Sequence, residues 1–106
     1  MLLRDVIPDE ASWCQGAFGR DTDGKECHPR ESSCVKRCLI GGLQFLYFTY
    51  DGGNMDEWRS ARDRMKRILE SNPRIFYGNI SEWQDTATWE EVSKVIDEFD
   101  SKAKGI

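Results

Sequence analysis

The sequence lacks an excess of basic residues. Its 106 residues carry 15 Lys and Arg against 19 Asp and Glu, which gives a formal net charge of −4 and a pI near 5.0. General nucleic-acid binding needs a positive surface that releases counterions from the phosphates. We therefore do not expect a nucleic acid as the partner of this protein.

The sequence also lacks a long hydrophobic run. Arg4 and Asp5 stand within the first five residues, which is unlike a secretory signal peptide. No apolar stretch approaches the roughly 20 residues that span a bilayer. These two absences predict a cytoplasmic protein that has no membrane partner. In such a reducing compartment, we expect the four cysteines to be mostly thiols.

Internal repeats, linkers and low-complexity tracts are absent too. The length and the content of 39% hydrophobic and 32% charged residues are typical of one globular domain. We divide this single domain, residues 1–106, into an N-terminal arm (1–12), a motif loop (13–33) and a helical core (34–104). The arm is expected to be ordered but irregular, with Asp9 or Ser12 capping a short turn.

Apolar residues recur at helical spacing in three segments, residues 34–50, 54–72 and 88–104. The predicted fold is therefore mainly all-α: a small single domain of three main helices with long structured loops. Gly41 and Gly42 lie inside the first helix, where each costs about 1 kcal/mol relative to alanine. Such a pair predicts the close approach of another backbone.

The predicted helices have recognisable N-terminal caps. Ser32 or Ser33 is expected to cap the first helix. The second and third begin with sequences typical of capping boxes, Asn54 with Glu57 and Thr88 with Glu91. Residues 74–87 are expected to connect the last two helices. The basic run on the second helix and the acidic run on the third are expected to be solvated faces of opposite sign.

Histidine is scarce, since His28 is the only one, and this limits the chemistry open to the cysteines. A catalytic Cys14 would need His28 as its base, and no acidic residue stands out to orient that histidine. Zinc is an alternative, because five soft ligands fall within 25 residues. Cys34 and Cys38 would share one face of the first predicted helix. The simpler interpretation is that both are packed in the core. The five are Cys14, Cys27, His28, Cys34 and Cys38.

The motif loop combines residue types that make specific contacts. It begins with Trp13-Cys14-Gln15-Gly16-Ala17, followed by the pair Arg20-Asp21. Asp21-Thr22-Asp23-Gly24-Lys25 is typical of a turn in which glycine adopts a positive φ. We expect Arg20, Asp21 and Arg37 to form a buried ion-pair or hydrogen-bond network, with Asp85 as a further partner.

These blocks resemble a small bacterial and phage domain family of unknown function, over roughly residues 12–97. The chain departs from the family pattern at Lys36-Arg37, where an aromatic residue is common, at Gly42 for Ala, and at Gln84 for Asn. The resemblance implies motif boundaries and a fold, without a reaction. The matching segments are Trp13 to Ala17, Arg20-Asp21 with Gly24, Arg37 to Gly41, Ile80 to Asp85, and Thr88 with Glu91-Val92.

Together these observations favour a small non-catalytic binding or regulatory protein that acts through protein–protein contacts. One form of this hypothesis is a phage-encoded protein that engages a host or defence protein, and self-association is another. No catalytic residue, metal ligand or cofactor is assigned. Alternatives are a small-ligand or cysteine-dependent site under the Trp13–Asp21 loop, and a zinc-binding structural domain. The candidate binding residues are Trp13, Cys14, Gln15, Arg20, Asp21, Arg37, Trp83 and Asp85.

Overall fold

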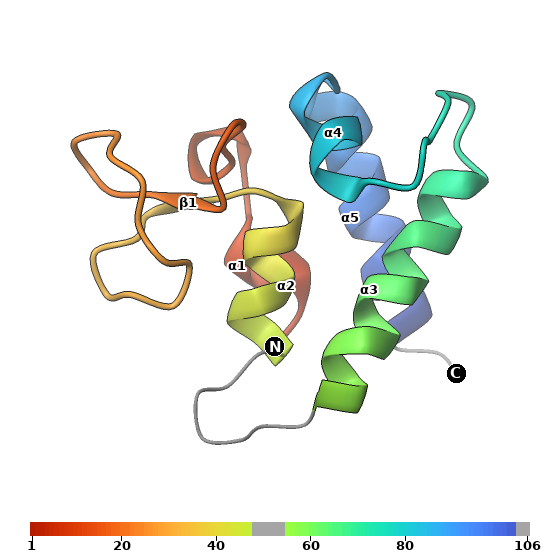
Figure 1. The fold of residues 1–106 in the computed structure, drawn as a ribbon, viewed down its shortest axis with the longest axis horizontal. Helices are drawn as coiled ribbons and strands as arrows, with labels where there is room; N and C mark the ends of the chain where they lie inside the picture. Colours follow the sequence, from red (N-terminus) through yellow and green to blue (C-terminus); the bar gives the residue numbers. More distant parts are fainter. Residues whose placement is uncertain (48–54, 104–106) are drawn as a thin grey trace.

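The structure, a computed structural model, describes residues 1–47 and 55–103. This part of the chain is a mainly α single domain, as predicted. Figure 1 shows α2, α3 and α5 beside one another, with the motif loop and its two short strands projecting on one side. The elements are α1 (Leu3–Val6), the 3₁₀ turn η1 (Glu10–Ser12), β1 (Gly19–Arg20), β2 (Lys36–Arg37), α2 (Leu39–Tyr47), α3 (Met55–Glu70), α4 (Ile80–Asp85) and α5 (Trp89–Ala103).

The N-terminal arm belongs to the core, so its prediction as irregular chain is wrong. Leu3 and Ile7 are fully buried. The buried carboxylate of Asp100, on α5, accepts hydrogen bonds from the backbone N–H groups of Leu3 and Arg4, both at 2.9 Å. It therefore satisfies two of the donors that the start of any helix leaves open. The predicted cap at Asp9 is confirmed, since its side chain accepts from the backbone N–H of Ser12.

The central helix begins later than predicted. Residues 34–38 are not helical, because Lys36–Arg37 pairs antiparallel with Gly19–Arg20. This pairing extends the backbone up to Cys38, so neither Ser32 nor Ser33 caps a helix, and α2 begins at Leu39. Residues 48–50 of the predicted helix lie outside the described residues.

The region between α3 and α5 also differs from its prediction. Residues 80–85 form α4, which Asn79 caps by accepting from the backbone N–H of Glu82. The sequence predicted only a connector there. The capping box before α5 is confirmed, because the backbone N–H of Glu91 donates to Thr88 Oγ1 at 3.2 Å and the N–H of Thr88 donates back to Glu91. The box predicted at Asn54 lies outside the described residues.

The core lies where α2, α3 and α5 meet α1 and α4. Its largest fully buried side chains include Phe99, Ile96, Leu43 and Met65. Trp13 and Trp83 extend this cluster toward the motif loop and α4. The hydrophobic core therefore reaches the residues that the sequence assigned to a site.

The glycine pair of α2 explains how the motif loop docks. A Cβ on Gly41 would stand 1.9 Å from the carbonyl oxygen of Phe18, and one on Gly42 would stand 2.7 Å from Leu3 Cδ1. The predicted close approach of a backbone is therefore confirmed at Gly41. At Gly42 the neighbour is instead the side chains of α1. The same Phe18 carbonyl accepts a hydrogen bond from the backbone N–H of Cys38 at 3.2 Å.

Gly41→Ala is predicted to destabilise the protein by about 3 kcal/mol, because the new methyl group meets backbone that α2 itself holds in place. Gly42→Ala is the matched control. Its methyl group meets the flexible ends of Leu3 and Ile7, and it gains about 1 kcal/mol of helix propensity. Urea unfolding of both variants measures the difference. Equal losses of stability would contradict the docking described here.

Candidate functional site

Trp13 anchors the motif loop to α4. It is 9% exposed, and its indole Nε1 donates a hydrogen bond of 2.6 Å to Gln84 Oε1. Its ring packs against that of Trp89, with centroids 5.8 Å apart. Trp13 is thus placed to hold structure, and its polar atom is fully used inside the protein.

Gln84 is the centre of this arrangement, and the sequence analysis did not select it. The side chain is 0% exposed. Its oxygen also lies 3.4 Å from the backbone N–H of Leu39, and its amide nitrogen donates to the carbonyl of Cys14 at 3.3 Å. An amide can accept and donate at once, which neither a carboxylate nor a leucine can do. In the sequence it stood out only by its place between Trp83 and Asp85 and as the glutamine where the resembled family has asparagine.

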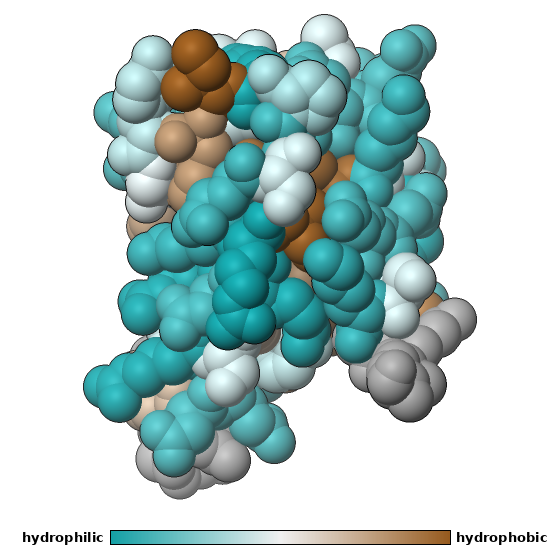
Figure 2. All heavy atoms as spheres, turned by 90° about the vertical axis from the view of Figure 1, so that its right-hand side faces the viewer, coloured by the Kyte–Doolittle hydropathy of each residue, from teal (hydrophilic) through white to brown (hydrophobic). Residues whose placement is uncertain are grey.

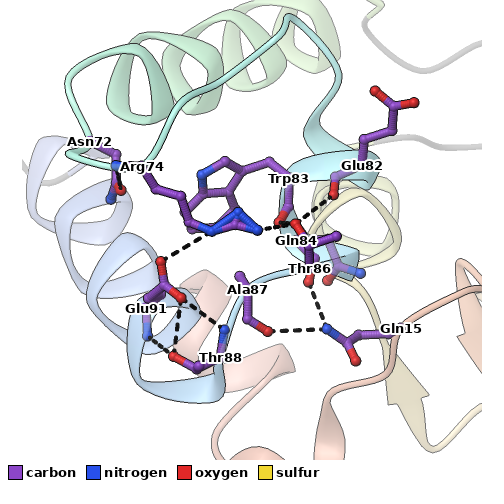
Figure 3. Close-up of polar contacts among 10 residues, drawn as sticks. All are labelled: Gln15, Asn72, Arg74, Glu82, Trp83, Gln84, Thr86, Ala87, Thr88 and Glu91. Atoms are coloured by element: carbon purple, nitrogen blue, oxygen red, sulfur yellow. Dashed lines mark hydrogen bonds and ion pairs between the residues drawn. The ribbon is translucent and has the colours of Figure 1, made fainter.

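A second row of contacts joins the same two segments. The Gln15 side chain donates to the carbonyls of Gln84 and Ala87, at 3.0 and 3.1 Å (Figure 3). The Asp85 carboxylate accepts from the backbone N–H of Gly16 at 3.0 Å, where Gly16 has a φ of +78°. Glycine adopts this angle readily, whereas other residues do so with strain. Gln15, Gly16 and Asp85 therefore continue the attachment that Trp13 begins.

Arg20 and Arg37 donate hydrogen bonds to backbone carbonyls, and neither forms an ion pair with another described residue. Arg20 donates to the carbonyls of Gly24 and Gln15, at 2.9 and 3.2 Å. Arg37 donates to the carbonyl of Pro29 at 2.8 Å and lies over the ring of Phe45. The sequence predicted either ion pairs or hydrogen bonds among Arg20, Asp21, Arg37 and Asp85. The described residues show no ion pair among these four, and hydrogen bonds to backbone groups attach the loop.

Asp21 closes the predicted turn. Its carboxylate accepts from the backbone N–H groups of Asp23 and Lys25, at 2.9 and 3.0 Å. Gly24 has a φ of +80°, as the sequence pattern predicted. Among the described residues, the polar contacts of Asp21 are therefore contacts within its own turn, which argues for a structural role.

The pKa values of Cys14, Cys27 and Cys38 are raised. Burial raises the pKa of the Cys14 thiol to about 11, and burial likewise raises the pKa of Cys38 to about 11. Burial, followed by a hydrogen bond with the Cys34 thiol, raises the pKa of Cys27 to about 12. Because the thiolate is the reactive form, these shifts disfavour cysteine chemistry near neutral pH. His28 instead uses its Nδ1 to accept from the backbone N–H of Arg30 at 3.2 Å.

The geometric premise of the zinc hypothesis is wrong. Cys34 precedes β2 and Cys38 precedes α2, so the two thiols do not lie on one face of a helix. In residues 1–47 and 55–103, no group of three or more His, Cys, Asp or Glu side chains is placed to hold a metal ion. Cys14, Cys34 and Cys38 are buried, as the simpler interpretation predicted.

Trp83 lies beneath an arginine on the other side of α4. The Arg74 guanidinium is 5.6 Å from the centroid of its ring, forms an ion pair with Glu91 at 3.4 Å and donates to Thr86 (Figure 3). Trp83 is 3% exposed, and its buried Nε1 has no hydrogen-bond partner among the described residues. The residue lines a hollow of about 390 Å³ between α4 and the segment that precedes it.

Four such hollows adjoin one another and form what we call the Phe18 groove. Neighbouring hollows share lining residues: Phe18 lines three of them, and Asp85 lines both the hollow at the motif loop and the one at Trp83. Figure 1 shows that the segments involved, the motif loop, the start of α2 and α4, lie next to one another in the upper half of the molecule. The shared residues that define the groove are Phe18, Glu26, Asn79, Ser81 and Asp85.

Exposed hydrophobic side chains gather along this groove. Six large ones are exposed in the described part of the chain, and three of them line the groove: Phe18 at 50%, Ile75 at 68% and Tyr77 at 83%. By contrast, the face that carries α3 and part of α5 is mostly hydrophilic (Figure 2). Exposed hydrophobic side chains indicate an interaction site when several of them gather on one part of the surface.

The predicted binding residues contribute unequally to the groove. Trp83 and Asp85 line it, whereas Cys14, Gln15 and Arg20 do not line the hollow beneath their own loop. That hollow measures about 280 Å³ and is bordered instead by Gly16, Phe18 and Cys38, among others. The sequence analysis missed Phe18, Ile75 and Tyr77, because their exposure depends on how distant segments pack.

Comparisons with known proteins support the resemblance noted from the sequence. A protein-family model matches residues 2–99, and its description is a family of unknown function. No curated protein and no solved structure matches the chain. None of the described helices has the length and apolar character needed to cross a membrane.

Gln84→Leu is predicted to destabilise the protein by about 3 kcal/mol, because it leaves the buried Trp13 N–H and the Cys14 carbonyl without partners. Gln44→Leu, the same change on α2, is the control. Gln44 Oε1 is buried without a partner among the described residues, so its loss should change stability by less than about 1 kcal/mol. Urea unfolding compares the two variants, and similar losses would contradict a central role for Gln84.

Raising the pH above about 9 is predicted to destabilise the protein through Cys14. Below pH 9 this thiol is protonated in both states. Between pH 9 and about 11 only the unfolded state loses the proton, so the free energy of unfolding falls. The difference of two pKa units corresponds to about 2–3 kcal/mol.

Urea unfolding of the wild type and of Cys14→Ala, at about pH 8 and about pH 10.5, tests this linkage. Every other titrating group is common to the two proteins. The wild type should therefore lose about 2 kcal/mol more stability than the variant over this interval. If the wild type and Cys14→Ala lose the same amount of stability, Cys14 has the same pKa in the folded and unfolded states, and the prediction is wrong.

Proposed function

The chain thus belongs to DUF6197, a family of unknown function, and we propose that it is a non-catalytic protein-binding domain whose Phe18 groove holds an extended segment of a partner protein. The observation that carries this proposal is the placement of Phe18, Ile75 and Tyr77, half or more exposed, along one series of adjoining hollows.

The groove suits a polypeptide better than a compact ligand. Its four hollows, of about 240–500 Å³ each, share lining residues, so an occupant that reached several of them would be extended rather than compact. Aromatic residues such as Tyr77 and Phe18 supply large contact areas and are enriched among the residues that dominate binding energy. Successive side chains of one segment could occupy successive hollows.

The interior chemistry supports a non-catalytic role. Burial holds the thiols of Cys14 and Cys38 in the protonated form near neutral pH. The conspicuous motif residues Trp13, Gln15 and Arg20 direct their polar atoms to backbone or to Gln84. A bacterial or phage origin, a cytoplasmic location and a host or defence protein as partner stay predictions from the sequence.

Selection from a library of random short peptides tests the proposal without knowledge of the natural partner. The immobilised wild-type protein should enrich peptides with hydrophobic residues. Phe18→Ser and Tyr77→Ser should each weaken binding of a selected peptide about tenfold or more, because each removes a large apolar contact. Fluorescence polarisation of the labelled peptide measures the affinity.

Val35→Ser is the matched control for these variants. Val35 is 43% exposed and lies outside the four hollows of the groove, so its replacement should change peptide affinity less than twofold, an estimate of roughly 0.4 kcal/mol. Circular dichroism checks that all three variants fold. The proposal fails when no peptide is enriched, or when Phe18→Ser and Tyr77→Ser bind as tightly as Val35→Ser.

A further inference from the structure

Within the Phe18 groove, we infer that the hollow between α3 and the start of α4 is a subsite for an acidic side chain of the bound segment. This inference rests on the proposed function and names the chemistry of the partner. The hollow measures about 240 Å³, and its charged lining residues are Arg62 and Lys66. No carboxylate stands among the described residues that line it.

Arg62 and Lys66 lie close together, and their positive charges are not fully neutralised by carboxylates among the described residues. Arg62 and Lys66 are four residues apart on α3, so their side chains are neighbours on one face of the helix and repel each other. Both are half-buried. The nearest ion-pair partner of Arg62 in the described residues is Asp63, at 3.9 Å from Nε, which is too far for a hydrogen bond.

One hydrogen-bond donor of these two side chains is buried without an acceptor. The buried Nε–H of Arg62 has no hydrogen-bond partner in the described part of the protein. Leaving a donor of a charged group unsatisfied is costly, and a carboxylate satisfies a guanidinium with short, charge-assisted bonds. The Arg62 side chain as a whole is 38% exposed, so an incoming Asp or Glu side chain would bind its exposed atoms and relieve the repulsion between Arg62 and Lys66.

The neighbouring hollow has the opposite charge. It shares Phe18 and Ser81 with the cationic hollow, but its charged lining residues are Glu26 and Asp85. Phe18, which is half-exposed, thus lines both a basic and an acidic hollow. This arrangement is complementary to a segment that carries an acidic residue, a hydrophobic residue and a basic residue in succession. Such charge complementarity fixes register and orientation in addition to affinity.

The peptide selection, repeated with charge variants, tests the inference. Wild-type protein should enrich peptides in which an acidic residue stands at a fixed distance from the hydrophobic residue. Arg62→Glu combined with Lys66→Glu should enrich a basic residue at that position and bind the wild-type peptide at least about tenfold more weakly. The double variant Arg62→Gln and Lys66→Gln also removes the attraction for an acidic side chain. It replaces the double glutamate variant if that variant does not fold.

Arg59→Glu combined with Arg67→Glu is the matched control. Both residues are exposed on the same helix and outside the hollow, so this pair changes the net charge equally. It should retain the acidic position and bind the wild-type peptide within about twofold.

The inference is overturned, and the proposed function stands, when the wild type enriches hydrophobic peptides without an acidic position. The same conclusion follows when acidic peptides bind the Arg62 and Lys66 variants as tightly as they bind the control. Absence of any enriched peptide overturns the proposed function, and this inference with it.

Discussion

The buried amide of Gln84 is the interaction on which the rest of the structure depends. Its oxygen faces the Trp13 indole N–H and the backbone N–H of Leu39, and its nitrogen faces the carbonyl of Cys14. These groups come from segments that are 45 to 71 residues away in the sequence. An unpaired amide in the core is costly. The motif loop, the start of α2 and α4 are therefore stable together in essentially one register.

This attachment also determines where the exposed residues stand. With Trp13 and Gln15 fixed to α4, the loop passes over α2, and the Phe18 carbonyl lies against Gly41. Its backbone is thereby held on α2, while its ring is left half-exposed where three hollows meet. The conspicuous motif residues thus support the proposed binding surface from beneath it. Their less conspicuous neighbour Phe18 forms part of that surface.

The sequence predicted the features that local chemistry controls. The bulk of α3 and α5, the Thr88 capping box and the Asp21–Lys25 turn follow from spacing and side-chain type within a few residues. It did not predict the pairing of Lys36–Arg37 with Gly19–Arg20, because a two-residue ladder leaves no periodic signal. The sequence did not predict the Phe18 groove either. Whether Phe18 or Tyr77 is exposed depends on distant packing, which a single sequence does not reveal.

The distribution of charge shows how tertiary structure changes what a charged residue does. The sequence suggested an acidic face on α5, yet Asp100 is buried as the cap of α1, and Asp97 and Glu91 pair with Arg4 and Arg74. Much of the acidic character of α5 is therefore used to attach other segments. Other charged residues border Phe18 instead: Arg62 and Lys66 of α3 line one of its hollows, and Glu26 and Asp85 line another. The sequence assigned opposite charges to two helices, whereas the structure places residues of both signs in two hollows that share Phe18.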